Sequence, residues 1–315
     1  MNPAEMRVVF MGSPGFAVPS LRALVHARYQ VVQVVTQPDR PAGRGGRLTP
    51  PEVKVAALEL GLPVSQPETL KDESVRMSLA AAAPDLFVVA AYGKILSRAV
   101  LAIPARGCIN VHASLLPRWR GASPIAAAIA AGDDETGVSI MEMAVRMDAG
   151  PVIACERVPI GSADTTGSLE QSLAVVGAGL LVAALPEWHD GTRVAVPQDE
   201  SQATYCSLVR KEDGWLRASM SVVEAERTVR ACDPWPGAYV LYRGDRLAIW
   251  RSHPEPAAPA GSPGDLVVCG RNPALVLADG ALVLDEVQRT GGRRLSGADF
   301  FNGERGRLEA RVGLA

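Results

Sequence analysis

The sequence predicts an α/β fold, a doubly wound and mostly parallel sheet, followed by a small OB-like β-barrel domain. Two observations predict the sheet: apolar, β-branched runs recur along the first half of the chain, and segments with helical spacing separate them. A third observation, a series of short strands with turn signals after residue 207, predicts the barrel. The chain has 315 residues, which is more than a single hydrophobic core typically accommodates, so we expect two domains.

The predicted first domain, residues 6–190, alternates strands with helices. Apolar runs predict strands at 7–11, 31–35, 85–91, 107–111, 136–145 and 151–160. Helical spacing predicts helices at 19–27, 51–61, 74–82, 123–131 and 165–188. This alternation indicates a parallel sheet covered on both faces, and such sheets bind ligands at the carboxyl ends of their strands.

A polar segment, residues 191–206, is predicted to link this domain to a second one at 207–315. The second domain begins with a predicted helix at 222–231. Short strands follow at 238–242, 246–252, 264–269, 274–278 and 281–287. Arg243-Gly244-Asp245 and Asp279-Gly280 are turn signals between these strands, as in a small antiparallel barrel.

The composition is that of an ordinary soluble protein, with 48% hydrophobic and 21% charged residues. We expect no membrane span and no signal peptide, and therefore a cytoplasmic protein. Five widely spaced cysteines without a CxxC pair argue against a zinc site or a disulfide framework. The net charge of −2 does not indicate a general nucleic-acid binder, so any RNA contact would come from a local patch. Nothing in the sequence requires more than a monomer.

An amide and an imidazole lie at the end of one predicted strand. Asn110 and His112 alternate along that strand, so both side chains point to the same face. Asp148 follows on a turn that ends at Gly150. A hydrogen-bond donor, a base and an orienting acid suffice for acyl transfer. Taken singly, His112 would be a buried structural histidine and Asp148 an ordinary turn residue; their combination favours chemistry.

A long Gly/Pro-rich loop, residues 37–48, carries Arg40, Arg44 and Arg47. Two interpretations stay open: a solvated surface loop, or a flap that contacts phosphates and orders on binding. Gly12-Ser13-Pro14-Gly15 favours a tight strand-to-helix turn over a dinucleotide site, because Pro14 lacks the backbone donor that a phosphate cradle uses.

Two prolines surround a tryptophan at Asp233-Pro234-Trp235-Pro236-Gly237. Such a turn is stiff, and we expect it to anchor packing in the second domain.

At these residues the chain resembles a known superfamily, the 10-formyltetrahydrofolate-dependent formyltransferases. The shared motifs are Asn-x-His at 110–112, Ser-Leu-Leu-Pro-x-Trp-Arg-Gly at 114–121 and Asp-x-Gly at 148–150. Segments 36–45, 89–96 and 233–237 resemble the methionyl-tRNA formyltransferase family within it. The resemblance runs from about Arg7 to the last predicted strands and is weakest after Ser252.

The resemblance implies a Rossmann-like formyltransferase domain and formyl transfer from 10-formyltetrahydrofolate to the α-amine of initiator Met-tRNA, without a metal. It gives catalytic positions to Asn110, His112 and Asp148. It gives folate-binding positions to Ser114, Leu115, Leu116, Pro117, Tyr92 and Gly93. It gives tRNA-binding positions to Arg40, Arg44 and Arg47, and a tRNA-binding role to the OB-like domain.

Two departures concern tRNA binding. Gly46 stands where the family often has a basic residue, and Trp215-Leu216-Arg217 stands where Ile-Asp-Trp is usual. Residues 207–315 carry 15 Lys/Arg and 14 Asp/Glu, a net charge of 15 − 14 = +1, so the loop arginines and shape would contribute more than a basic face. The nearest alternative is an amino-sugar nucleotide N-formyltransferase. A nicotinamide oxidoreductase and a non-catalytic RNA-binding module are more distant ones.

Overall fold

A computed structural model describes residues 3–42, 46–255, 260–304, 308 and 312–313. The chain divides into two compact units. The first unit comprises Met1–Pro124, Glu135–Pro159 and Glu170–Cys206. The second comprises Ile125–Asp134, Ile160–Leu169 and Ser207–Ala315.

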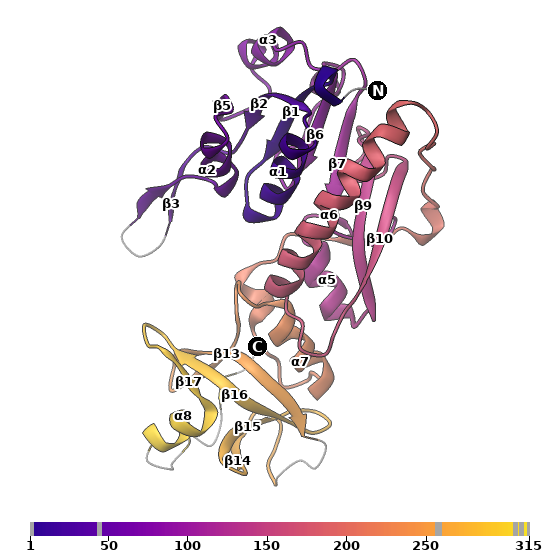
Figure 1. Cartoon of the computed structure of the whole chain (residues 1–315). Helices are drawn as coiled ribbons and strands as arrows, with labels where there is room; N and C mark the ends of the chain where they lie inside the picture. The colour runs from indigo at the N-terminus through magenta and orange to yellow at the C-terminus, as the bar shows by residue number, and fades with distance from the viewer. Residues whose placement is uncertain (1–2, 43–45, 256–259, 305–307, 309–311, 314–315) are drawn as a thin grey trace. The chain divides into compact units, whose positions relative to one another are not determined.

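The first unit is built on a seven-stranded sheet with the order β10-β9-β7-β6-β1-β2-β5 (Figure 1). Its strands are β1 (Arg7–Gly12), β2 (Gln30–Val35), β5 (Val64–Ser65), β6 (Leu86–Ala90), β7 (Cys108–His112), β9 (Glu135–Glu142) and β10 (Val152–Pro159). The five strands from β5 to β7 are parallel, whereas β9 and β10 are antiparallel. The predicted doubly wound, mostly parallel sheet is thus confirmed.

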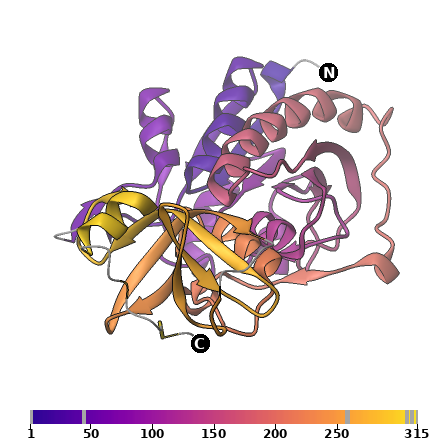
Figure 2. The same ribbon diagram turned by 90° about the horizontal axis from the view of Figure 1, so that it is seen from below.

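Helices lie between these strands along the chain and after the last of them (Figures 1 and 2). They are α1 (Val18–His26), α2 (Glu52–Glu59), α3 (Glu73–Ala81), the short α4 (Arg98–Leu101) and α6 (Thr166–His189). The apolar positions of α1, Leu21 and Leu24, are fully buried, as its spacing predicts. One core cluster joins Val9, Phe87 and Val89 with Leu79 of α3. The same cluster includes Cys108 of β7, so it anchors the strand whose carboxyl end carries the site.

Helix α6 lies against β7 and β9. A Cβ atom at Gly177 would come within 2.9 Å of Val111 and 3.1 Å of Val138, so only glycine permits this close approach. By length and composition α6 would suffice to cross a membrane, which the sequence analysis did not expect of any stretch. Of its most apolar window, 44% is buried inside the protein, and apolar core helices pass the same test.

The second unit contains a curled antiparallel sheet with the order β12-β13-β16-β15-β14, and β17 pairs with β16 (Figure 1). Its elements are α5 (Pro124–Ala131), α7 (Val222–Ala231), β12 (Ala238–Tyr242), β13 (Asp245–Glu255), β14 (Leu266–Cys269), β15 (Asn272–Val276), β16 (Ala281–Arg289), β17 (Arg294–Ser296) and α8 (Gly297–Gly303). Backbone bonds from Val312 to Gly264 and between Gly313 and Leu241 bring the two edges together, so the sheet forms the predicted barrel-like domain. The sequence patterns did not predict β17 and α8.

The Pro-Trp-Pro turn differs from its prediction as a packing anchor. The Trp235 side chain is 53% exposed. The turn is held instead through its backbone, because Gly237 donates to the Cys232 carbonyl at 2.8 Å and Gly167 donates to the Asp233 carbonyl at 3.0 Å. Cys232, just before the turn, is buried.

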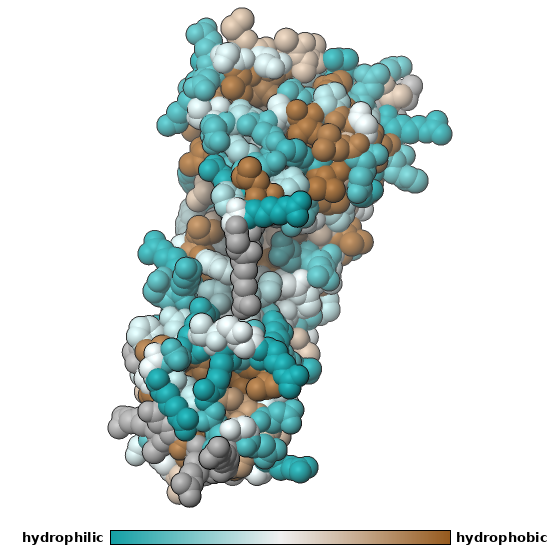
Figure 3. Space-filling view, turned by 90° about the vertical axis from the view of Figure 1, so that its left-hand side faces the viewer, coloured by the Kyte–Doolittle hydropathy of each residue, from teal (hydrophilic) through white to brown (hydrophobic). Residues whose placement is uncertain are grey.

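Two segments predicted without regular structure contain strands. The arginine loop includes a hairpin of β3 (Arg40–Ala42) and β4 (Arg47–Thr49). Within 191–206, β11 (Tyr205–Cys206) pairs in parallel with β8 (Arg120–Gly121) of the first unit. The surface mixes hydrophilic and apolar side chains (Figure 3), and exposed Leu58, Met77 and Ile95 are spread over α2, α3 and the loop after β6.

Candidate active site

The carboxyl end of β7 carries both Asn110 and His112. The strand is paired in parallel with β6 and antiparallel with β9, where Asn110 lies opposite Met141 and His112 opposite Ser139. Two residues apart on one strand, the amide and imidazole share a face of the sheet. His112 is only 6% exposed, whereas Asn110 is half-buried.

The hydrogen bond of His112 determines which ring nitrogen is available. Nε2 lies 3.0 Å from the backbone oxygen of Trp119. Because a carbonyl oxygen only accepts, Nε2 carries a proton there. The other nitrogen, Nδ1, faces Oδ2 of Asp148 at 4.0 Å. That separation is too long for a hydrogen bond, and it leaves both groups able to contact one shared substrate atom or water.

Asp148 is held on a tight turn. Its φ of 51° is in the left-handed region, which a non-glycine residue adopts at a cost. Oδ2 accepts a hydrogen bond of 2.9 Å from the backbone N–H of Gly121. At Gly150, an added Cβ would be 1.8 Å from the Glu142 oxygen, so only glycine fits. The Asp-x-Gly spacing therefore has a steric reason, and Asp148 reaches His112 from the loop after β9.

The loop after β7 is pinned by a hydroxyl from the neighbouring strand. Ser139 donates to the Ser114 carbonyl at 2.7 Å and accepts from the Leu116 N–H at 3.1 Å. The Ser114 hydroxyl donates to the Arg118 carbonyl at 2.6 Å, so it shapes the loop internally. Sequence reasoning missed Ser139, whose signal is a hydroxyl between the apolar residues Val138 and Ile140 of β9.

The three predicted folate positions after Ser114 are all apolar and half-buried. Leu115 packs over Gly137, where a Cβ would come within 2.6 Å of its side chain. Leu116 and Pro117 are half-buried and present apolar surface. Apolar walls of this kind suit a flat ligand.

Tyr92 and Gly93 follow the end of β6. The Tyr92 ring is 2% exposed and lies in the core, where burial raises the pKa of its hydroxyl to about 12. Gly93 is exposed, with a φ of 78°. A ligand would therefore meet this pair at the Gly93 backbone and not at the tyrosine ring.

A buried arginine lies beside the site. Arg120 is fully buried and donates to Oε1 of Gln198 at 2.8 Å and to Oε1 of Glu200 at 2.9 Å. Hydrogen bonds from Arg120 and then Arg146 lower the pKa of Glu200 to about 2. Sequence reasoning missed Gln198 and Glu200 because they belong to the segment predicted as a linker. The available signal was Arg120 itself, because a charged side chain that the fold buries needs polar or acidic partners.

Two of the three predicted tRNA-binding arginines, Arg40 and Arg47, lie in the β3–β4 hairpin. The Arg40 side chain is 65% exposed and approaches Glu68 at 3.2 Å. Arg47 is also exposed. Arg44 lies outside the described residues. The two described arginines are thus exposed on the surface, whereas Arg120 is buried.

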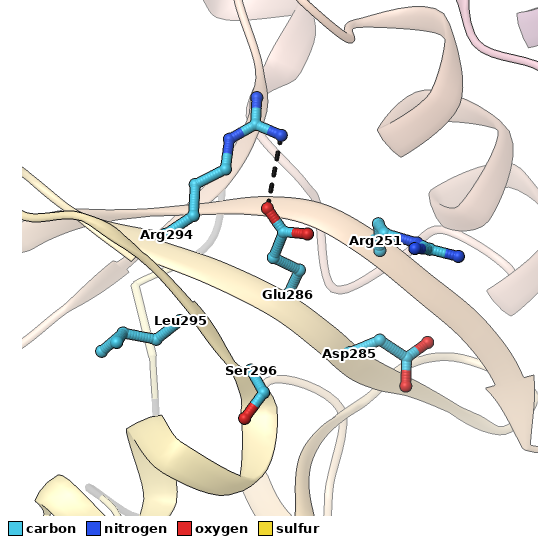
Figure 4. Close-up of a pocket in the computed structure, with 6 residues that line it drawn as sticks. All are labelled: Arg251, Asp285, Glu286, Arg294, Leu295 and Ser296. Atoms are coloured by element: carbon cyan, nitrogen blue, oxygen red, sulfur yellow. Dashed lines mark hydrogen bonds and ion pairs between the residues drawn. The ribbon is translucent and has the colours of Figure 1, made fainter.

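The second unit has a hollow of about 430 Å³, lined by Arg251, Asp285, Glu286, Arg294, Leu295 and Ser296 (Figure 4). Arg294 pairs with Glu286 at 3.3 Å and stacks over the Trp250 ring at 3.9 Å. Two arginines face two carboxylates here, so the hollow has balanced charge. Sequence reasoning did not single it out.

Among the residues with described positions, no group of three or more His, Cys, Asp or Glu side chains has the geometry to hold a metal ion.

Comparison with known proteins defines the class. Residues 6–185 match the formyl transferase family and residues 208–305 match the formyl transferase C-terminal domain. The chain is therefore a formyl-transfer enzyme. It is 47% identical to methionyl-tRNA formyltransferase of Methylococcus capsulatus, over 94% of this chain and 96% of the relative. It is 49% identical to that of Chloroflexus aggregans, over 95% and 97%. The chain belongs to the methionyl-tRNA formyltransferase family, which confirms the resemblance.

Solved structures share the fold at low identity. WlaRD, a sugar 3N-formyl transferase, superposes with a TM-score of 0.67 at 16% identity, over 91% of this chain and 99% of its own. HypX from Aquifex aeolicus, in complex with tetrahydrofolic acid, gives 0.63 at 17%, over 94% of this chain and 47% of its own. These likenesses support the predicted architecture.

Proposed function

We propose that this enzyme transfers the formyl group of 10-formyltetrahydrofolate to the free α-amine of methionyl-initiator tRNA. The observation that carries the proposal is the approach of His112 Nδ1 to Asp148 Oδ2, 4.0 Å apart, at the strand end that also bears Asn110. Relatives named methionyl-tRNA formyltransferase, near 47% identity over almost the whole chain, support the acceptor.

The reaction needs a neutral amine and a stabilised oxygen. An α-amine titrates near pH ~8, so a useful fraction is neutral at physiological pH. As it attacks the formyl carbon, negative charge develops on the formyl oxygen. We propose that the Asn110 side-chain N–H donates to that oxygen, together with the Nδ1–H of a protonated His112. Loss of one such donor typically costs ~3 kcal/mol of barrier.

The proton transfer is assisted by Asp148. With Nε2–H committed to the Trp119 carbonyl, Nδ1 carries the second proton of the protonated His112 and donates it to the developing oxyanion. The attacking nitrogen gives up its proton, and the folate nitrogen regains one as its bond to the formyl carbon breaks. Asp148 stabilises the His112 imidazolium by charge attraction and helps to move the proton from the first nitrogen to the second.

The two substrates are assigned to different surfaces. Leu116, Pro117 and the Gly93 backbone would contact the folate, with Ser114, Leu115 and Tyr92 shaping that wall. Arg40, Arg44 and Arg47 would contact tRNA phosphates, alongside the barrel-like domain. Translation initiation would place such a protein in the cytoplasm, and one chain carries all of these groups, so we propose that it acts as a monomer.

A formylation assay tests the proposal. Charged initiator and elongator tRNAs are compared, each with and without 10-formyltetrahydrofolate, and an amino-sugar nucleotide tests the alternative acceptor. His112→Ala and Asp148→Asn should each lower kcat by about 10²–10⁴-fold while the fold stays intact. His26→Ala, an exposed histidine on α1, is the matched control. Near-normal turnover in either site variant would rule out this assignment.

A further inference from the structure

We propose that Gln198 is a positioning residue that holds the Asp148 turn toward His112. Its side-chain Nε2 donates to the Asp148 carbonyl at 2.8 Å and to the Gly150 carbonyl at 2.7 Å. One amide thus binds both ends of the turn that carries the carboxylate. The inference rests on the catalytic role proposed for Asp148.

The orientation of the Gln198 amide is fixed by Arg120. The amide oxygen accepts from Arg120 Nε at 3.1 Å and from Nη2 at 2.8 Å. A guanidinium has only donors, so the oxygen must face Arg120 and the NH₂ must face the turn. Glu200 holds the guanidinium in turn, at 2.9 Å. A chain of bonds thus runs from Glu200 to the backbone of Asp148.

Strand β8, which carries Arg120, also holds the carboxylate of Asp148. Gly121, which follows Arg120 in β8, donates its backbone N–H to Oδ2 of Asp148. A Cβ at Gly121 would come within 2.0 Å of the Cys206 oxygen, so the pairing of β8 with β11 requires glycine here. Arg120 therefore fixes the backbone of Asp148 through Gln198, and its neighbour Gly121 fixes the carboxylate directly.

Asp148 needs this support because its backbone is strained. Positive φ values at non-glycine residues are unfavourable and persist only where surrounding contacts hold them. Without the amide, two carbonyls of the turn would lose their donor and the carboxylate would shift. A misplacement of about 1 Å costs about 10²-fold in rate.

Gln198→Met tests the inference, since methionine keeps the length of the side chain and removes both polar atoms. We expect kcat to fall about 10- to 100-fold, with KM for folate and for tRNA changing less than about twofold. Gln202→Met, an exposed glutamine in the same segment, is the matched control and should keep full activity. Unchanged kcat in Gln198→Met would overturn the proposal.

A double variant distinguishes positioning from a general structural role. If Gln198 acts through Asp148, then Gln198→Met combined with Asp148→Asn should be no slower than Asp148→Asn alone, within about twofold. Losses that multiply would overturn the inference. If Asp148→Asn is itself fully active, the proposed active site fails instead, so the two failures are distinct. Should Gln198→Met not fold, Gln198→Glu keeps an oxygen for Arg120 and replaces the donating NH₂ by a second, negatively charged oxygen, and it should be at least as slow.

Discussion

Two arginine sites in the first unit show opposite physical designs. Arg120 is fully buried and bound by Gln198, Glu200 and the Tyr205 hydroxyl. Arg40 of the hairpin is 65% exposed, with an ion pair to Glu68 at 3.2 Å. A desolvated guanidinium with satisfied donors is rigid, whereas an exposed one is screened by salt and keeps its side-chain freedom. The buried arginine suits a site that must be preformed, and the exposed one suits a flexible partner.

The largest expected difference between the buried and the exposed arginine site is in their contribution to the free energy of unfolding. Arg120→Met removes one partner of a buried network and leaves the Gln198 oxygen without its donor. We expect a loss of about 3 kcal/mol in the free energy of unfolding, together with reduced kcat because Gln198 loses its orientation. Urea unfolding followed by tryptophan fluorescence measures the first effect, and the formylation assay measures the second.

Arg22→Met is the matched control for this prediction. Arg22 also pairs with a glutamate, Glu59, at 2.5 Å, but both side chains are at least half exposed. Exposed pairs contribute about 0–1 kcal/mol. Equal losses in the Arg22 and Arg120 variants would show that burial does not separate the two kinds of site.

The sequence allowed the sheet, the barrel-like domain and the approach of His112 to Asp148 to be predicted, because local periodicity and short motifs encode them. The network around Arg120 was not predictable in this way. Gln198 and Glu200 lie 78 and 80 residues from Arg120 along the chain. In a polar segment such residues look like a solvated linker, and only the pairing of β8 with β11 shows which of them reach Arg120.

The folate loop offers a smaller test. Ser139→Ala would leave the Ser114 carbonyl and the Leu116 N–H without their shared hydroxyl, inside the protein. We expect a loss of about 1–3 kcal/mol in unfolding free energy and a rise in KM for 10-formyltetrahydrofolate, because the loop relaxes. Ser201→Ala, an exposed hydroxyl on the first unit, should change neither quantity. A change in KM for tRNA alone would contradict the assignment of this loop to folate.

The smallest effect on stability is expected at the hairpin. Arg47 is exposed, so Arg47→Ala should change the free energy of unfolding by less than about 0.5 kcal/mol. Its effect should fall on the partner: KM for tRNA rises while KM for folate stays constant, as we also expect for Arg44. Loss of one phosphate contact should reduce the slope of log K for tRNA against log salt by about one. Lys71→Ala, which also removes an exposed cation, controls for overall charge. An unchanged salt slope in Arg47→Ala would make the hairpin a solvated surface feature, and the difference between the two arginine sites would then be one of burial alone.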